Sequence, residues 1–304
     1  MVRTVKLNDG TSVPAMGWGN MGGKEKALNS GAVALRAGIK HIDSAQIYRT
    51  EAEVMGAINA AGMKREDVYI TTKVFNMPNT PKLHSQQDLR TSVKRSLSEL
   101  GCIPNLLLVH NPHIPAEGQL AEFWGWLEEL VEDGTLKGCS LGVSNFRPVD
   151  LEEVMRVAKI KPVVNQIEYH PYVMTHVAPL IALHKQHNII TQAYASLAPT
   201  TRHPTGGPLK PILERIAAEL TKESGVEVDS SGVLLLWIMT RGGVCITSSS
   251  SEERIKKMAA LEKVRDLNEA EMGEIDAAGG KVHFRQWDEH LTTDFPSPDL
   301  PSDF

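Results

Sequence analysis

The sequence predicts an α/β protein whose strands close into a (β/α)8 TIM barrel. Eight short apolar runs alternate with amphipathic stretches of helical period along almost the whole chain. Strands joined by crossover helices must be parallel, and parallel strands are buried on both faces, which agrees with their apolar composition. Eight such units favour one closed barrel, so we expect residues 1–304 to form a single domain.

The first residues stand outside this alternation. Thr4–Leu7 and Thr11–Val13 flank the sequence Asn8-Asp9-Gly10, which is typical of a hairpin with an Asp-Gly turn. We expect this hairpin to close the floor of the barrel. The eight barrel strands are then expected at Ala15–Trp18, Ile39–Ile42, Val68–Thr72, Leu106–Val109, Ser140–Val143, Val163–Val164, Ile189–Ala193 and Val244–Ile246.

Amphipathic helices are expected between these strands, and turn residues mark several of their ends. Gly38 and Gly101 follow helical stretches, at the position where glycine tolerates a left-handed backbone, and Pro148 opens another helix. From Lys281 the chain is rich in Pro and Asp, so we expect residues 281–304 to run over the barrel mouth. The expected helices include Lys24–Ala37, Glu51–Ala60, Ser85–Leu100, Gln119–Val131, Pro148–Val157, Thr175–His187 and Glu252–Leu261.

Composition excludes several classes of protein. A hydrophobic fraction of 41% and a charged fraction of 23% are typical of a soluble globular protein. A net charge of −5 offers no basic surface for nucleic acid or an anionic membrane. The longest strongly apolar run, Val233–Met239, is far shorter than the ~20 residues that span a bilayer. Three widely spaced cysteines favour neither a disulfide framework nor a zinc site, so we expect a cytoplasmic enzyme.

Polar residues follow most of the predicted strands. The carboxyl ends of barrel strands meet at one mouth, where barrel enzymes place their chemistry. One polar residue at a strand end is common, but six consecutive strands with such an ending predict a site. The residues concerned are Asp43, Lys73, His110, Ser144 with Asn145, Gln166 and Tyr194.

Tyr48 lies five residues beyond Asp43, and the two form a chemically meaningful set with Lys73 and His110. A free tyrosine titrates near ~10, and a neighbouring ammonium held by a carboxylate lowers that pKa. A neutral histidine beside it can donate a hydrogen bond to a substrate oxygen. This equipment protonates a carbonyl oxygen, and a nicotinamide is the natural source of the electron pair. The alternative is that Asp43 and Lys73 form a purely structural ion pair and that Tyr48 only lies at the mouth. His110 and His113 are separated by a spacing that is unusual for metal ligands, so a metal site is not expected.

Longer ordered segments carry a family resemblance. The chain resembles the aldo-keto reductases from about Val2 to Trp287, and looks most like the fungal reductases of aldehydes, ketoesters and dicarbonyls. The resemblance implies reduction of an aldehyde or ketone by NADPH in a barrel, and a monomer or weak homodimer. The matching segments are Lys40–Tyr48, Tyr69–Lys73, Leu107–His110, Gly142–Phe146 and Asn165–Pro171.

The resemblance also implies roles for individual residues. Tyr48 is expected to be the general acid, with Asp43 and Lys73 tuning it and His110 orienting the carbonyl. Ser144, Asn145 and Gln166 are expected to hold the nicotinamide carboxamide, and Tyr194 to stack on its ring. The remaining expected cofactor contacts are Gly19, Asn20, Asp43, Ala195, Leu197, Ser248, Ser249, Ser250 and Arg254, and no metal is expected.

Arg254 follows four serines and matches the family's ligand for the adenosine 2′-phosphate, which favours NADPH over NADH. The alternative is a serine-capped helix with a solvated arginine. Ser248 stands where the family often has a lysine, and Met258 where it has Asn or Gln. Lys256 and Lys257 are candidate substitutes for that lysine.

The substrate pocket is less well defined by the sequence. Met21 stands where the family often has Trp, and the short loop from His110 to Gln119 predicts an open pocket that admits bulky ketones. The expected wall residues are Trp18, Met21, Phe75, His113 and Trp287.

Two other interpretations compete with a barrel reductase. Gly17–Gly22 matches GxGxxG, with Asp43 at the end of the next strand, as in a Rossmann fingerprint. The poor preceding strand, the hairpin and the eight-fold alternation count against it. The second is a non-catalytic nicotinamide-binding subunit that senses redox state. The intact set of Asp43, Tyr48, Lys73 and His110 counts against that one.

Overall fold

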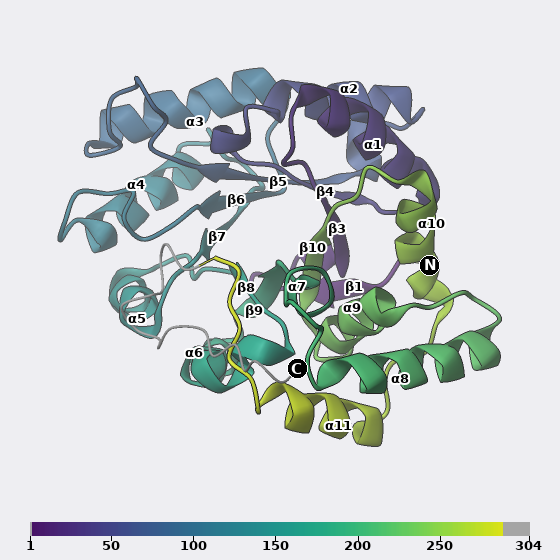
Figure 1. Ribbon diagram of the computed structural model, residues 1–304. Helices are drawn as coiled ribbons and strands as arrows, with labels where there is room; N and C mark the ends of the chain where they lie inside the picture. Colours follow the sequence, from purple (N-terminus) through teal and green to yellow (C-terminus); the bar gives the residue numbers. More distant parts are fainter. Residues whose placement is uncertain (1, 288–304) are drawn as a thin grey trace.

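The computed structural model of the protein describes residues 2–287. Eight parallel strands close into a barrel in the order β10-β3-β4-β5-β6-β7-β8-β9, so the predicted fold is confirmed (Figure 1). Seven of the strands lie within two residues of the expected bounds, whereas the strand expected at Val163–Val164 ends four residues later than predicted. The eight strands are β3 (Met16–Gly19), β4 (His41–Asp43), β5 (Tyr69–Val74), β6 (Leu106–Val109), β7 (Ser140–Ser144), β8 (Val164–Glu168), β9 (Ile190–Tyr194) and β10 (Val244–Thr247).

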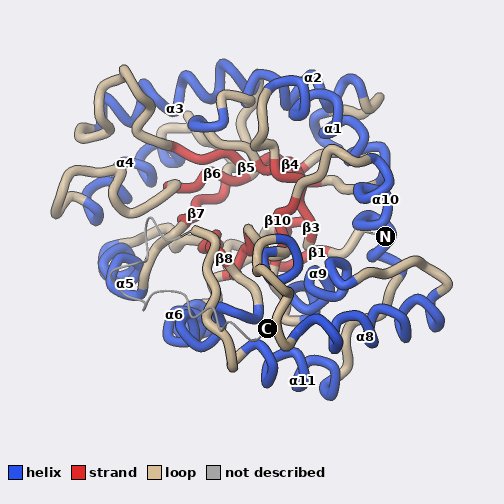
Figure 2. Tube along the Cα trace, in the orientation of Figure 1, coloured by secondary structure: helices blue, strands red, loops and turns tan. Residues whose placement is uncertain are grey.

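The helices surround the ring of strands, as Figure 2 shows. Within residues 2–287, no helix is both long and apolar enough to span a membrane. The α-helices are α1 (Lys24–Ala37), α2 (Glu51–Ala60), α3 (Gln86–Leu100), α4 (Leu120–Glu132), α5 (Pro148–Val157), α6 (Met174–His187), α7 (Ala198–Thr201), α8 (Leu209–Ser224), α9 (Ser230–Thr240), α10 (Glu252–Ala260) and α11 (Glu269–Gly279). Short 3-10 turns are η1 (Gln46–Tyr48), η2 (Arg65–Asp67), η3 (Pro171–Val173) and η4 (Leu261–Lys263).

The apolar run at Val233–Met239 lies in α9, where every one of its residues is buried. A helix that is covered on all sides needs no polar face, which is why the run has no amphipathic period.

The amino-terminal hairpin pairs β1 (Thr4–Lys6) with β2 (Ser12–Pro14) in antiparallel register. Its buried Leu7 and Val13 pack against residues of the barrel strands. The carboxylate of Asp9 accepts a 2.6 Å hydrogen bond from the hydroxyl of Ser140, which begins β7. Because these contacts lie at the amino ends of the strands, the hairpin closes the floor of the barrel as expected.

After α11 the chain turns back along η3 and the start of α6. The backbone N–H of Phe284 donates a 3.1 Å hydrogen bond to the carbonyl of Tyr172 in η3. In Figure 1 this segment is the yellow chain that passes over β8. Residues 281–287 of the expected tail therefore reach the mouth, whereas residues 288–304 lie outside the described residues.

Candidate active site

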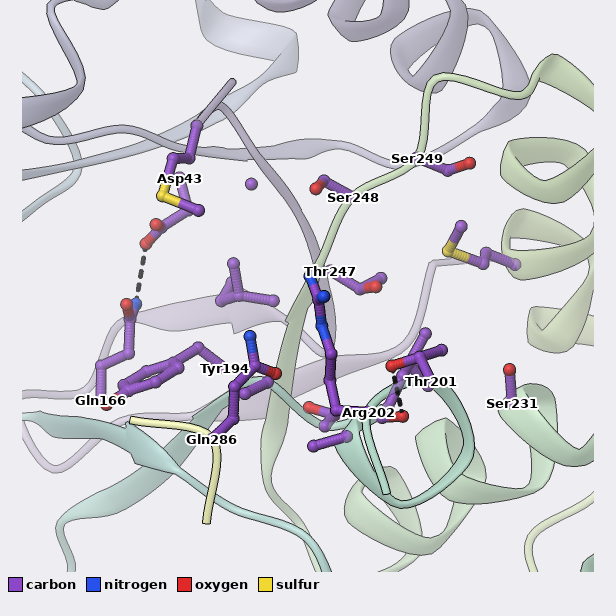
Figure 3. Close-up of a pocket in the computed structure, with 18 of the residues that line it drawn as sticks. Asp43, Gln166, Tyr194, Thr201, Arg202, Ser231, Thr247, Ser248, Ser249 and Gln286 are labelled. Atoms are coloured by element: carbon purple, nitrogen blue, oxygen red, sulfur yellow. Dashed lines mark hydrogen bonds between the residues drawn. The ribbon is translucent and has the colours of Figure 1, made fainter. Parts of the chain in front are cut away.

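A cavity of about 740 Å³ opens at the carboxyl ends of the barrel strands. In Figure 3, Asp43 and Gln166 lie in one part of it, and Ser248 and Ser249 lie on another side. The lining contains most of the residues that the sequence predicts. These are Gly19, Met21, Asp43, Tyr48, Phe75, His110, Ser144, Asn145, Gln166, Tyr194, Ala195, Leu197, Ser248, Ser249, Arg254 and Trp287.

Asp43 and Lys73 form an ion pair directly beneath Tyr48. The Lys73 ammonium donates to the Asp43 carboxylate and also to the backbone carbonyl of Ser44, at 2.9 Å. Both charged side chains are buried, so each depends on the other for compensation. The Lys73 Nζ lies 5.1 Å from the centre of the Tyr48 ring. The structure thus brings together three residues that span 30 positions of the sequence.

Burial raises the pKa of Tyr48 above its ordinary value of 10.0, and the Lys73 ammonium opposes that rise without reversing it. The expected net lowering of the Tyr48 pKa is therefore wrong for the protein alone. The reason is desolvation, which disfavours the phenolate more than one ion-paired ammonium favours it. Tyr48 is consequently a neutral phenol near pH 7, and a neutral phenol can donate a proton.

His110 stands beside this tyrosine at the end of β6. Its ring meets the Tyr48 ring edge-on, with centroids 5.9 Å apart, and the Phe75 ring at 5.3 Å. The backbone carbonyl of His110 accepts a 3.0 Å hydrogen bond from the Asn145 amide. This contact links the end of β6 to the next strand and restricts the position of the imidazole.

The amide-bearing residues form a connected network next to the ion pair. The Gln166 amide donates to the second Asp43 oxygen at 2.8 Å, and the Ser144 hydroxyl donates to the Gln166 carbonyl at 2.8 Å. The Tyr194 hydroxyl donates to the Asn145 side-chain oxygen at 2.7 Å. Asn145 has φ of 59°, a left-handed conformation that Asn tolerates better than most residues. The network presents amide and hydroxyl groups to the cavity in fixed orientations.

The serine-rich segment borders the cavity between β10 and α10. Ser248, Ser249 and Arg254 line it, while Ser251 caps α10 by accepting a hydrogen bond from the Arg254 backbone N–H. Lys26 reaches across from α1, and its Nζ donates to the Ser248 hydroxyl at 3.1 Å. The Lys26 ammonium, the Arg254 guanidinium and the serine hydroxyls near the amino terminus of α10 form a site suited to phosphate.

The two candidate substitutes for a lysine at Ser248 are engaged elsewhere. Lys257 lines the cavity but pairs with Glu227 at 2.6 Å and with Glu253 at 3.0 Å. Lys256 pairs with Glu252 at 2.7 Å. Lys26, which the sequence analysis did not single out, is the lysine that contacts Ser248. No local sequence pattern predicts the contact between Lys26 and Ser248, because 222 positions separate the two residues.

The cavity fits a dinucleotide. Gly19 lies in its wall, and a Cβ there would come within 3.4 Å of Ile246 and 3.8 Å of the Ser248 Cβ. These are ordinary van der Waals distances, so the wall at Gly19 would accept a Cβ without displacing either neighbour. Oriented amides lie on one side of the space and the cationic serine-rich segment on another, which suits a carboxamide and phosphates respectively.

Five predicted site residues fall outside the cavity lining. Lys73 is one of them, since it is buried behind Tyr48 and reaches the site through Asp43. Trp18 is fully buried and faces α1, because side chains alternate along β3 and Gly17 and Gly19 occupy the inner face. The buried amide of Asn20 donates to the Thr50 carbonyl at 3.2 Å and so ties β3 to α2. His113 and Ser250 are exposed on the loops and do not line the cavity.

The Rossmann interpretation of Gly17–Gly22 is wrong. These residues form β3 and the loop after it, inside a closed barrel. A Cβ at Gly17 would lie 2.5 Å from the Ile246 side chain and 2.7 Å from the His41 ring. Gly17 is therefore needed for close packing inside the barrel, where a side chain would overlap its neighbours.

Comparisons with known proteins agree with this geometry. The model of the aldo/keto reductase family matches residues 10–279. A NAD/NADP-dependent indole-3-acetaldehyde reductase of Schizosaccharomyces pombe is 34% identical over 289 residues, which cover 92% of this chain and 95% of that protein. A glycerol 2-dehydrogenase (NADP(+)) of Hypocrea jecorina is 32% identical over 298 residues, which cover 87% and 89% of the two chains. The crystal structure of an aldo/keto reductase from Brucella melitensis has a TM-score of 0.77 and 31% identity, and covers 91% of this chain and 100% of that one. Sequence, fold and site together show that the chain belongs to the aldo/keto reductase family.

Proposed function

We propose that this chain is an NADPH-dependent carbonyl reductase in which Tyr48 donates the proton to the carbonyl oxygen. The observation that supports this proposal most strongly is the position of Tyr48. Its ring lines the cavity beside His110, and the buried Lys73–Asp43 pair lies directly behind it. The Schizosaccharomyces pombe relative is named as an aldehyde reductase, and the Hypocrea jecorina relative is named as a glycerol dehydrogenase.

Proton donation follows from the charges around Tyr48. The phenol is neutral before the reaction because burial raises its pKa. As the proton leaves, the phenolate gains the attraction of the Lys73 ammonium, which Asp43 holds in place. His110 is placed to donate a hydrogen bond to the same carbonyl oxygen as it gains charge. When bound, NADPH supplies the hydride for the carbonyl carbon.

The cofactor would be held along the length of the cavity. Ser144, Asn145 and Gln166 would bind the carboxamide, and the Tyr194 ring would offer an apolar face to the nicotinamide. Ser248, Ser249, Arg254 and Lys26 would bind the phosphates, with Arg254 selecting NADPH over NADH by the 2′-phosphate. A relative with 34% identity is named for both NAD and NADP, which agrees with a moderate rather than absolute preference.

The reactive end of the cavity favours apolar carbonyl substrates. Met21, Ile47, Phe75 and Trp287 line it together with Tyr48 and His110. These side chains bury apolar surface of a substrate and offer no opposite charge to an ionic one. Aldehydes and ketones with aromatic or aliphatic substituents are therefore the expected substrates.

The test is Tyr48→Phe, assayed with NADPH and an aromatic aldehyde. We expect turnover to fall by about three orders of magnitude, because the ring stays and only the proton donor is lost. The NADPH dissociation constant should change less than twofold. Tyr69→Phe is the matched control, since its hydroxyl is buried in β5 outside the cavity lining.

A Tyr48→Phe enzyme that keeps more than a tenth of the turnover would remove Tyr48 from the acid role. A wild-type protein that binds NADPH but reduces no carbonyl would instead indicate a nicotinamide-binding sensor.

A further inference from the structure

Glu168 is a buried carboxylate at the end of β8 that the proposed chemistry does not use. It is fully buried, and its first oxygen accepts a hydrogen bond from His170 Nε2 at 3.0 Å. The same oxygen accepts the backbone N–H of Gln286 at 2.6 Å, and the second accepts that of Trp287 at 2.8 Å. A buried carboxylate is strongly destabilising without such partners, so the partners and the carboxylate hold one another in place.

These two amides belong to a segment that is remote in sequence and close to the reaction. Glu168 and Trp287 are 119 positions apart. Gln286 and Trp287 line the cavity that Tyr48 and His110 line, whereas Glu168 is absent from that lining. Trp287 is 41% exposed, so its indole is available to contact a substrate.

A second contact, at Phe284, holds the beginning of this segment. Phe284 donates its backbone N–H to the Tyr172 carbonyl, and the Phe284 side chain is buried. The backbone N–H groups of Gln286 and Trp287 both bond to the Glu168 carboxylate, which holds the end of the segment. Loss of the carboxylate therefore frees the end of the segment while its beginning stays attached.

We propose that Glu168 is a positioning residue that holds Trp287 as one wall of the substrate pocket and thereby sets the preference for aromatic over small carbonyl substrates. The inference rests on the proposed reductase function. Glu168 acts through the backbone of the segment and touches neither substrate nor cofactor. The Trp287 ring stabilises an aromatic substrate by ring contacts only when the orientation of the indole is fixed. The two hydrogen bonds from the backbone of the segment to Glu168 fix that orientation.

The first measurement is amide hydrogen exchange of the segment, which needs no substrate. In Glu168→Gln the carboxamide keeps one acceptor oxygen, but its NH2 group faces a backbone N–H, so one of the two bonds is lost. We expect exchange at residues 286–287 to accelerate at least tenfold, with little change at Phe284. Glu168→Asp, which keeps the charge on a shorter arm, is the second variant if Glu168→Gln does not fold.

The second measurement is the ratio of kcat/KM for an aromatic aldehyde to that for a small aliphatic aldehyde, with NADPH. In Glu168→Gln we expect this ratio to fall about tenfold, through a higher KM for the aromatic substrate with kcat changed less than threefold. Trp287→Ala should lower the ratio by a similar factor. The double variant should then fall no further than Trp287→Ala does, because Glu168 acts through Trp287.

Glu128→Gln is the matched control. Glu128 is also buried, and it accepts the backbone N–H groups of Lys159 and Ile160, each at 2.7 Å, outside the cavity lining. A change in the substrate ratio there would point to a general effect of neutralising a buried carboxylate and overturn the proposal.

The outcomes distinguish a failure of the proposed role of Glu168 from a failure of the proposed reductase function. Faster exchange with an unchanged substrate ratio overturns the specificity role of Glu168, and unchanged exchange overturns the anchor. A wild-type protein that reduces no carbonyl overturns the proposed function and the specificity role with it, while the exchange result still decides whether Glu168 anchors the segment.

Discussion

Lys26 shows how a single residue can supply a charge that a local sequence lacks. The serine-rich segment has Ser248 where the family often has a lysine, which predicts weaker binding of phosphate. The Lys26 ammonium nevertheless lies 3.1 Å from the Ser248 hydroxyl and 3.3 Å from the Met21 carbonyl. Burial lowers the pKa of Lys26, and an anion beside it would offset that desolvation.

Lys26→Ala should therefore weaken NADPH binding by about tenfold, the loss expected for one charge-assisted hydrogen bond near the surface. NADH should lose less, since it lacks the 2′-phosphate. Fluorescence titration with each cofactor measures both constants. Lys24→Ala is the control, because Lys24 lies on the same helix, is 71% exposed and pairs with Glu53 at 3.5 Å. Equal losses for the two lysines would show that only the overall charge matters.

Helix α11 illustrates how one element is fitted to its neighbour. Gly279, at its end, lies against η3, where a Cβ would come within 2.6 Å of the Pro171 side chain and 2.7 Å of its carbonyl oxygen. Gly273, in the same helix, is exposed and has nothing within 4 Å of a Cβ. The helix thus approaches η3 closely at one glycine and faces solvent at the other.

Alanine substitutions at these two glycines should have opposite effects on stability. Gly279→Ala should lower the free energy of unfolding by about 1–3 kcal/mol, because the proline backbone cannot move aside easily. Gly273→Ala should raise it by about 0.5–1 kcal/mol, since alanine restricts the unfolded chain and favours the helix. Denaturant unfolding of both variants measures the difference. Similar effects of the two substitutions would contradict close packing at Gly279.

For the whole molecule, buried histidines predict how stability responds to acid. Burial lowers the pKa of His41, inside the barrel, to about 4, and that of His184, on α6, to about 3. Both pKa values lie below the ordinary histidine value of 6.5, so each histidine is neutral in the folded protein near pH 7. The unfolded chain takes up these protons first as the pH falls, which favours unfolding below about pH 6.5.

The free energy of unfolding should therefore fall between pH 7 and pH 5 by roughly 1–2 kcal/mol for each of these histidines. Chemical unfolding at several pH values measures this slope. His41→Gln and His184→Gln should each be less stable at pH 7 but show a shallower slope. His84→Gln, at an exposed histidine, serves as the control. An unchanged slope in both buried variants would mean that other groups govern the acid sensitivity.

The order of the elements and the polar strand ends could be predicted from the sequence because they depend on local patterns. An apolar run flanked by amphipathic helices is a parallel strand wherever it occurs, and the carboxyl ends of such strands share one mouth. Asp43, Lys73, His110 and Gln166 were found in this way, and the structure brings all four together. Trp18 was misplaced because the strand-end rule does not say which face of β3 a residue occupies.

Contacts between distant segments, and the energetics of burial, were decided only by the tertiary structure. Lys26 meets Ser248 because barrel closure places β10 next to β3, and Glu168 meets Trp287 because the segment after α11 returns over the end of β8. No local pattern encodes such a meeting. The Tyr48 pKa was predicted with the wrong sign for the same reason, since desolvation depends on every atom packed around the phenol, whereas the sequence indicates only the charges nearby.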